Sequence, residues 1–127
     1  MKRVIVAVQN TLVSEVLSAA LKSQGMFVER SLSGAPQKVA SLCETLFADV
    51  LVMDVTRFGD GAFGNRAETV NAVRESNPKI KVCLVCDNVS DDETSFKVAS
   101  AKAIGLIDAF FYQSVPSDYI ADVIGTL

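Results

Sequence analysis

The chain has 127 residues, half of them hydrophobic and 21% charged, and this balance is typical of one compact globular domain. Its formal net charge of −3 and the scatter of its 12 basic residues argue against a nucleic-acid-binding surface. The sequence contains no histidine, which removes the commonest general base and the commonest metal ligand. Any catalysis would therefore have to use carboxylates, hydroxyls, thiols or lysines.

Neither a membrane span nor a secretory signal is predicted. No apolar run approaches the roughly 20 residues that a membrane-spanning helix needs. The basic start at residues 1–3 leads into an apolar run that stops at Gln9-Asn10, and no small-residue cleavage site follows. The three cysteines form no disulfide framework, which fits a reducing compartment, so we expect a cytoplasmic location.

Two of the cysteines, Cys83 and Cys86, match the C-x-x-C spacing of redox and metal sites. They lie in an apolar, strand-like run, where residues three apart point to opposite faces of a sheet. We therefore expect two buried strand cysteines and not a redox pair.

Five strand-like apolar runs alternate with segments of helical periodicity. The predicted strands cover residues 4–8, 26–31, 50–53, 80–86 and 109–112. The first, second and fifth helices have apolar stripes that we expect to be buried: Leu12, Val13, Val16, Leu17, Ala20 and Leu21; Val39, Leu42, Cys43, Leu46 and Phe47; and Ile120, Val123, Ile124 and Leu127. The third helix is a weakly amphipathic stretch over about 65–76, and the fourth is expected to run from a capping box at 90–93 to about 104. This alternation predicts a single α/β domain over residues 1–127, a (βα)₅ unit whose parallel sheet is covered on both faces. Its ligand site should lie at the carboxyl ends of the strands.

Asp54 comes directly after the apolar third strand, and Asp60-Gly61, Tyr112 and Pro116 follow later in the chain. With the order of the elements, these residues resemble response-regulator receiver domains of the CheY-like superfamily. This resemblance implies a flavodoxin-like strand order of 2-1-3-4-5 and a role in two-component signal transduction. In this family two acidic residues after the first strand bind Mg²⁺ together with the phosphate-accepting aspartate. A Ser or Thr and a lysine hold the phosphoryl oxygens.

Of these five key positions, only Asp54 keeps the family residue. Gln9 and Asn10 replace the acidic pair, Cys86 replaces the hydroxyl and Val115 replaces the lysine. One unit-charge contact at about 4 Å is worth roughly 4 kcal/mol at an effective dielectric of about 20, so losing two carboxylates should weaken Mg²⁺ binding strongly. We therefore expect Asp54 to be a phosphoacceptor candidate that is phosphorylated poorly or not at all, and a weak metal ligand at best.

Three further residues belong to the expected site. Thr56 lies in the loop after Asp54, and Asp87 lies beside the end of the fourth strand. Asp87 could replace a missing acid, although a carboxylate that caps a turn is the simpler interpretation. The resemblance implies that Tyr112 is the aromatic residue that moves between buried and exposed positions when the domain switches.

The leading interpretation is an atypical receiver domain that is not an enzyme and acts mainly through protein contacts. These contacts would use the surface of the fourth helix, fifth strand and fifth helix, with Lys97, Lys102 and Asp118 exposed, and could include a homodimer. The chain could also be part of a longer protein with a fused output domain. One alternative is a conventional receiver phosphorylated on Asp54 by a histidine kinase. Another is a flavodoxin-like small-molecule binder, although the first turn, residues 9–14, lacks the glycine that a phosphate-cradling loop needs.

Overall fold

Strands and helices alternate along the whole described part of the chain. The computed structural model describes residues 1–56, 59–86 and 92–127, without the side chains of Asp60, Asp92 and Ser95. The strands are β1 (Arg3–Ala7), β2 (Phe27–Arg30), β3 (Val50–Val55), β4 (Lys81–Cys86) and β5 (Ala109–Tyr112). The helices are α1 (Thr11–Ser23), α2 (Pro36–Thr45), α3 (Phe63–Ser76), α4 (Asp92–Ala103) and α5 (Ser117–Thr126), and a 3₁₀ turn, η1 (Gly59–Gly61), precedes α3.

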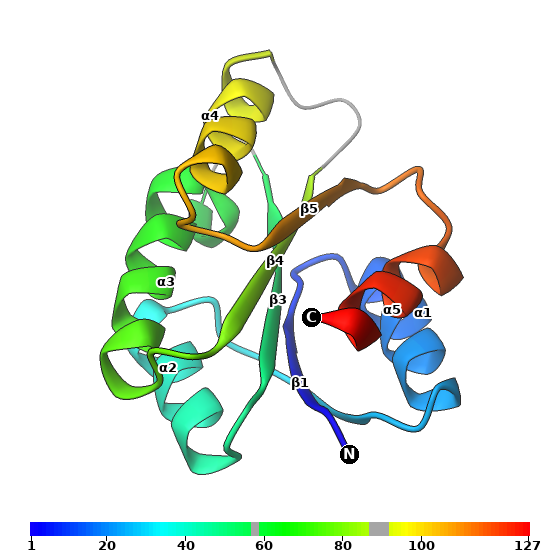
Figure 1. Cartoon of the computed structure of the whole chain (residues 1–127). Coiled ribbons are helices and arrows are strands. Elements are labelled where there is room, and N and C mark those ends of the chain that lie inside the picture. Colours follow the sequence, from blue (N-terminus) through cyan, green and yellow to red (C-terminus); the bar gives the residue numbers. More distant parts are fainter. Residues whose placement is uncertain (57–58, 87–91) are drawn as a thin grey trace.

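The strands form one parallel sheet in the order β2-β1-β3-β4-β5, which confirms the predicted fold class and strand order. Helices α1 and α5 cover one face of the sheet, and α2, α3 and α4 cover the other (Figure 1). Because all strands are parallel, their carboxyl ends lie along one edge of the sheet. No helix in the described ranges is long and apolar enough to cross a membrane.

The core consists of two apolar layers separated by the sheet. Along β3, Val50 and Val52 pack toward α1 and α5, whereas Leu51 and Met53 pack toward α2, α3 and α4. This burial on both faces explains why the central strands read as continuous apolar runs. Cys83 and Cys86 lie in different layers, as predicted for strand residues three apart, and both are free thiols.

The buried face of α1 differs from the predicted stripe. Leu12 is 71% exposed and Val16 is 48% exposed, so the prediction that both belong to the core is wrong. Ser14 and Ser18 are buried instead, together with Leu17 and Leu21. Small serine side chains let α1 lie close to its neighbours, and the helix is turned so that its larger residues Leu12 and Val16 line a groove beside α5.

Three smaller differences concern the ends of elements. Phe47 was expected in the stripe of the second helix, but α2 ends at Thr45 and Phe47 is 76% exposed, in a left-handed backbone conformation with φ of 53°. Asp54 lies inside β3 and not directly after the strand. Helix α3 begins at Phe63, two residues before the predicted start. The first two residues of the predicted capping box, 90–91, lie outside the described residues.

Candidate functional site

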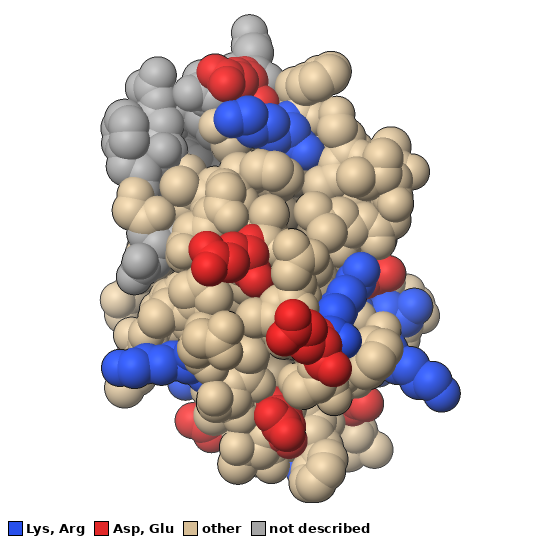
Figure 2. Space-filling model, turned by 90° about the vertical axis from the view of Figure 1, so that its left-hand side faces the viewer, with Lys and Arg blue, Asp and Glu red and all other residues tan. Residues whose placement is uncertain are grey.

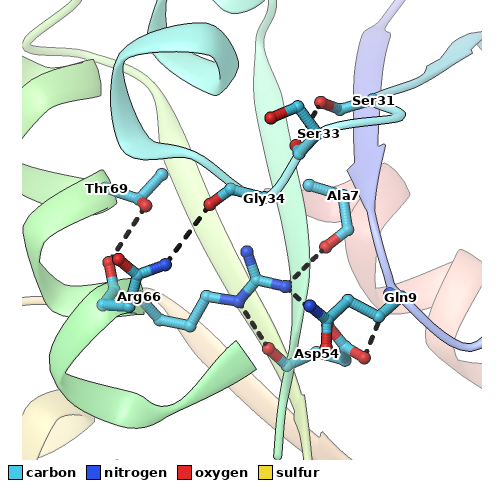
Figure 3. Close-up of polar contacts among 9 residues, drawn as sticks. Ala7, Gln9, Ser31, Ser33, Gly34, Asp54, Arg66 and Thr69 are labelled. Carbon is cyan, nitrogen blue, oxygen red and sulfur yellow. Dashed lines mark hydrogen bonds and ion pairs between the residues drawn. The ribbon is translucent and has the colours of Figure 1, made fainter. Parts of the chain in front are cut away.

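The carboxylate of Asp54 is buried near the carboxyl end of β3, and Asp54 is only 1% exposed. Its Oδ2 accepts a hydrogen bond from the backbone N–H of Gln9 at 3.1 Å. Its Oδ1 forms an ion pair with Arg66 Nη2 at 2.6 Å (Figure 3). Both carboxylate oxygens are therefore engaged by groups of the chain itself.

Arg66 extends from α3 to the carboxyl ends of two strands. Its Nε donates a hydrogen bond to the backbone carbonyl of Asp54 at 2.8 Å, and its Nη2 also donates to the carbonyl of Ala7 at 3.0 Å (Figure 3). Arg66 has no exposed surface, and it is among the largest fully buried side chains. A guanidinium suits this position because its donors form a rigid planar fork and it stays charged when buried. Arg66 thus joins β1, β3 and α3 at the candidate site.

No motif in the sequence singles out Arg66, although its position carries a signal. The buried residues of α3 are Arg66, Thr69, Val70 and Val73, which follow the i, i+3, i+4, i+7 spacing of a core-facing stripe. A charged residue in register with such a stripe must find a partner, because an unpaired buried charge is very costly. In the structure this partner is Asp54, which lies twelve residues earlier.

The ion pair changes which metal chemistry the site can support. Mg²⁺ prefers anionic oxygen ligands, and the family's site needs the phosphoacceptor carboxylate as one of them. Here one oxygen of Asp54 is 2.6 Å from a guanidinium nitrogen, and that cation occupies the place of a counter-ion. The residues that the structure describes around Asp54 therefore do not fit a Mg²⁺ site. Among the described residues, no cluster of three or more Cys, Asp or Glu side chains could hold a metal ion.

The two amides that replace the acidic pair have different positions. Asn10 is the N-cap of α1, and its Oδ1 accepts a hydrogen bond from the N–H of Val13 at 3.1 Å. Gln9 contacts Asp54 through its backbone, and its side-chain Oε1 lies toward Gly61. Gln9 therefore contacts Asp54 through its backbone N–H, while Asn10 has a helix-capping role.

The loop after β3 packs tightly over the strand end. The N–H of Thr56 donates to the carbonyl of Gly61 at 2.8 Å. A Cβ atom built on Gly61 would collide with Thr56 Oγ1 and would lie 3.0 Å from Gln9 Oε1. Glycine is required at this position because Thr56 and Gln9 already fill the space that a side chain would need.

Cys86 and Val115 belong to different layers of the core. Cys86 pairs in register with Val55 and is fully buried in the layer of α2, α3 and α4. Asp54 pairs with Val85, so the Cys86 side chain points to the opposite face of the sheet. Val115 packs against the other layer and lines the apolar groove beside α1, a cavity of about 230 Å³. Asp87, the remaining predicted pocket residue, lies outside the described residues.

Tyr112 is 41% exposed, in contrast to its buried neighbour Phe111. Its ring packs edge-on against Phe110, with 6.3 Å between the ring centroids. The exposed position is one of the two that the family resemblance implies, and the switching role of Tyr112 stays a prediction.

All three thiols are expected to be unreactive in the native protein. Burial raises the pKa of Cys43 to about 12 and that of Cys86 to about 11. Burial also raises the pKa of Cys83, with smaller contributions from Cys86 and Asp108. Because the thiolate is the reactive form, we expect almost no reaction with a disulfide reagent at neutral pH until denaturant unfolds the chain. Spectrophotometric thiol titration with and without denaturant measures this, and rapid labelling of the native protein would contradict it.

Comparison with known proteins supports the fold. No family model matches the sequence, and no curated protein matches it. The structure is similar to that of a CheY-like protein, tadZ, from Pseudomonas aeruginosa PAO1, with 17% identity, a TM-score of 0.74 and coverage of 99% of this chain and 98% of that one. It is also similar to an orphan response regulator of H. pylori, with 14% identity, a TM-score of 0.71 and coverage of 98% and 94%.

A third similar structure belongs to a longer protein, described as one of a family of streptococcal redox sensors that evolved from two-component response regulators. The identity is 16% and the TM-score is 0.78, and the match covers 99% of this chain and 50% of that protein. These similarities show that the chain has the CheY-like receiver fold. At such low identities they carry no information about the residues of the site.

Proposed function

From this CheY-like receiver fold, we propose that the chain is a signalling domain of the two-component type that acts through protein contacts and not through phosphorylation of Asp54. The observation that carries the proposal is the buried ion pair between Asp54 and Arg66. The sequence already lacks the acidic pair and the lysine of the family. In addition, the guanidinium of Arg66 occupies the carboxylate of Asp54, the one key position that keeps the family residue.

Phosphorylation needs a carboxylate oxygen that can approach phosphorus in line, while a metal ion and other cations neutralise the phosphoryl charge. In this chain, Oδ1 of Asp54 is held by Arg66 and Oδ2 by the N–H of Gln9. Asp54 is almost inaccessible, so a phosphoryl donor cannot reach it without a rearrangement of Arg66. The ion pair therefore supports a domain with one stable state.

We expect no phosphorylation when the protein is incubated with acetyl phosphate and Mg²⁺. Intact-mass spectrometry would detect an added phosphoryl group, and the Asp54→Asn variant gives the background. Stoichiometric modification of the native protein that is lost in Asp54→Asn would contradict the proposal and would favour the conventional receiver.

A control variant separates the two obstacles to phosphorylation, which are the missing partner groups of the family and the ion pair between Asp54 and Arg66. The triple substitution Gln9→Asp, Asn10→Asp and Val115→Lys restores the family's acidic pair and lysine but keeps Arg66. We expect this variant to stay unmodified as well, because Arg66 still holds the carboxylate. Efficient phosphorylation of the triple variant would mean that the missing partner groups, and not Arg66, prevent the reaction.

The proposed contact surface consists of α4, β5 and α5. Apolar side chains are exposed on each of these elements, which is typical of surfaces that bind other proteins; they are Phe96, Tyr112 and Tyr119, and Ile104 directly after α4 is exposed as well. Helix α4 also carries an ion pair between Lys97 and Glu93 at 3.3 Å. We propose that this surface contacts a partner protein, a fused output domain or a second copy of the chain.

Nucleic acid is not included among the proposed partners. On the face covered by α2, α3 and α4, basic and acidic side chains are interspersed, with no continuous basic patch among the described residues (Figure 2). A nucleic-acid-binding surface needs clustered Lys and Arg, because neutralisation of phosphates supplies most of its affinity.

A further inference from the structure

A second polar site lies on the side of Arg66 that faces away from Asp54. It is a cavity of about 300 Å³ at the carboxyl ends of β1 and β2, and its lining is mostly polar. The residues that carry the inference are Arg66, Arg30, Thr11 and Ser33. The cavity is separate from the apolar groove beside α1 that Val115 lines.

The first observation is an unused donor on a buried cation. The Nε and Nη2 atoms of Arg66 bind Asp54 and Ala7, but Nη1 has no hydrogen-bond partner among the described residues. Figure 3 shows Nη1 pointing away from Asp54, toward the loop of residues 31–34. Buried polar groups are nearly always hydrogen-bonded, and an unpaired donor on a charged group is especially costly. A ligand in the cavity could supply the missing acceptor.

The second observation is that Arg30, Ser33 and Thr11, which also line the cavity, can supply further donors. Among the described residues, Arg30 has one ion pair, a long contact with Glu15 at 3.9 Å between partly exposed side chains, which leaves its guanidinium able to bind a ligand. The Oγ of Ser33 accepts a hydrogen bond from the N–H of Ala35, which leaves the Ser33 O–H able to donate. Thr11 is the first residue of α1, so its N–H lacks a partner within the helix and lies at the positive end of the helix dipole.

We propose that this cavity binds a phosphate group through Arg66 Nη1, Arg30 and the donors of Thr11 and Ser33. Two guanidinium groups and neutral donors suit a compact anion with several acceptor oxygens, and charge-assisted bonds to phosphate are among the strongest that side chains make. The phosphate group would belong either to inorganic phosphate or to a small phosphomonoester. This binding is non-covalent and does not depend on the proposed signalling role.

Binding at this site has a consequence for Asp54. A phosphate on Nη1 completes the hydrogen bonds of Arg66 while Nε and Nη2 remain on Asp54 and Ala7. The ligand therefore stabilises the state in which Asp54 is held by Arg66. The domain would respond to the concentration of a phosphate compound and not to phosphoryl transfer.

The test is a titration of the ¹⁵N-labelled protein with inorganic phosphate at constant ionic strength, followed by NMR. We expect saturable shifts of the amides of Thr11 and of residues 31–34, with no comparable shifts in α4. The Arg30→Gln variant should bind about tenfold more weakly, because a charge-assisted contact is lost. Glu15→Gln should bind more tightly, because Arg30 loses its competing partner. Lys22→Gln, at the other end of α1, is the matched control and should bind as the native protein does.

A second arm distinguishes the sources of the phosphate group. Adenosine 5′-monophosphate and adenosine are titrated in the same way. Tighter binding of the monophosphate than of inorganic phosphate, at the same amides, would identify a phosphomonoester ligand, and the reverse order would identify free phosphate. The proposal is overturned if neither phosphate compound gives saturable shifts, if adenosine binds as tightly as both phosphate compounds, or if Arg30→Gln and Lys22→Gln behave alike.

Discussion

The Arg66→Met variant is expected to lose about 3–5 kcal/mol of the free energy of unfolding, because the buried carboxylate of Asp54 is left without its partner. Methionine keeps a similar apolar volume, so the loss reports the missing charge and hydrogen bonds more than a cavity. Urea denaturation followed by circular dichroism measures the change.

Two further variants show whether the loss comes from an unpaired buried charge. The double variant Asp54→Leu/Arg66→Met removes both charges and should recover most of the stability, because apolar pairs often replace buried ion pairs without net cost. Arg74→Met breaks a pair with Asp108 in which each side chain is about one quarter exposed, and should cost only about 1 kcal/mol or less. If Arg66→Met and Arg74→Met cost the same, Arg66 does not form the buried pair described above.

The Gly61→Ala variant is expected to be destabilised by about 1–3 kcal/mol, because its new methyl group would collide with the hydroxyl of Thr56. Relief of the collision requires the Thr56 side chain to turn or η1 to move away from the end of β3, where Thr56 N–H bonds to the carbonyl of Gly61. The same urea titration measures this effect.

Gly64→Ala is the matched control for this substitution. Gly64 lies in the first turn of α3, and a Cβ atom there meets no neighbour within 4 Å. Alanine should stabilise the helix by about 0.5–1 kcal/mol, since glycine loses more backbone freedom on folding. Opposite signs for the two substitutions are the expected result, and equal effects would contradict the tight packing at Gly61.

Much of the fold could be predicted from local sequence patterns. The continuous β-branched runs around Val52 and Val6 identify strands buried on both faces, and strict alternation with helical segments restricts them to a parallel sheet. Element ends were less predictable, because Phe47 and Leu12 are apolar residues whose burial depends on where a helix ends and how it is turned. Their hydrophobicity alone does not carry that information.

The candidate site, like the fold, could be predicted from the sequence only in part. The sequence by itself determined that Asp54 lies at the ligand-binding edge and that Val115 stands where the family has a lysine. Only the tertiary structure decided what Asp54 binds, because its partner comes from α3 and becomes a neighbour only after the sheet and helix have packed. Once both charges are buried, each needs the other far more than it would in water. That requirement couples Arg66 to Asp54, and it explains how a buried arginine occupies the candidate phosphorylation site.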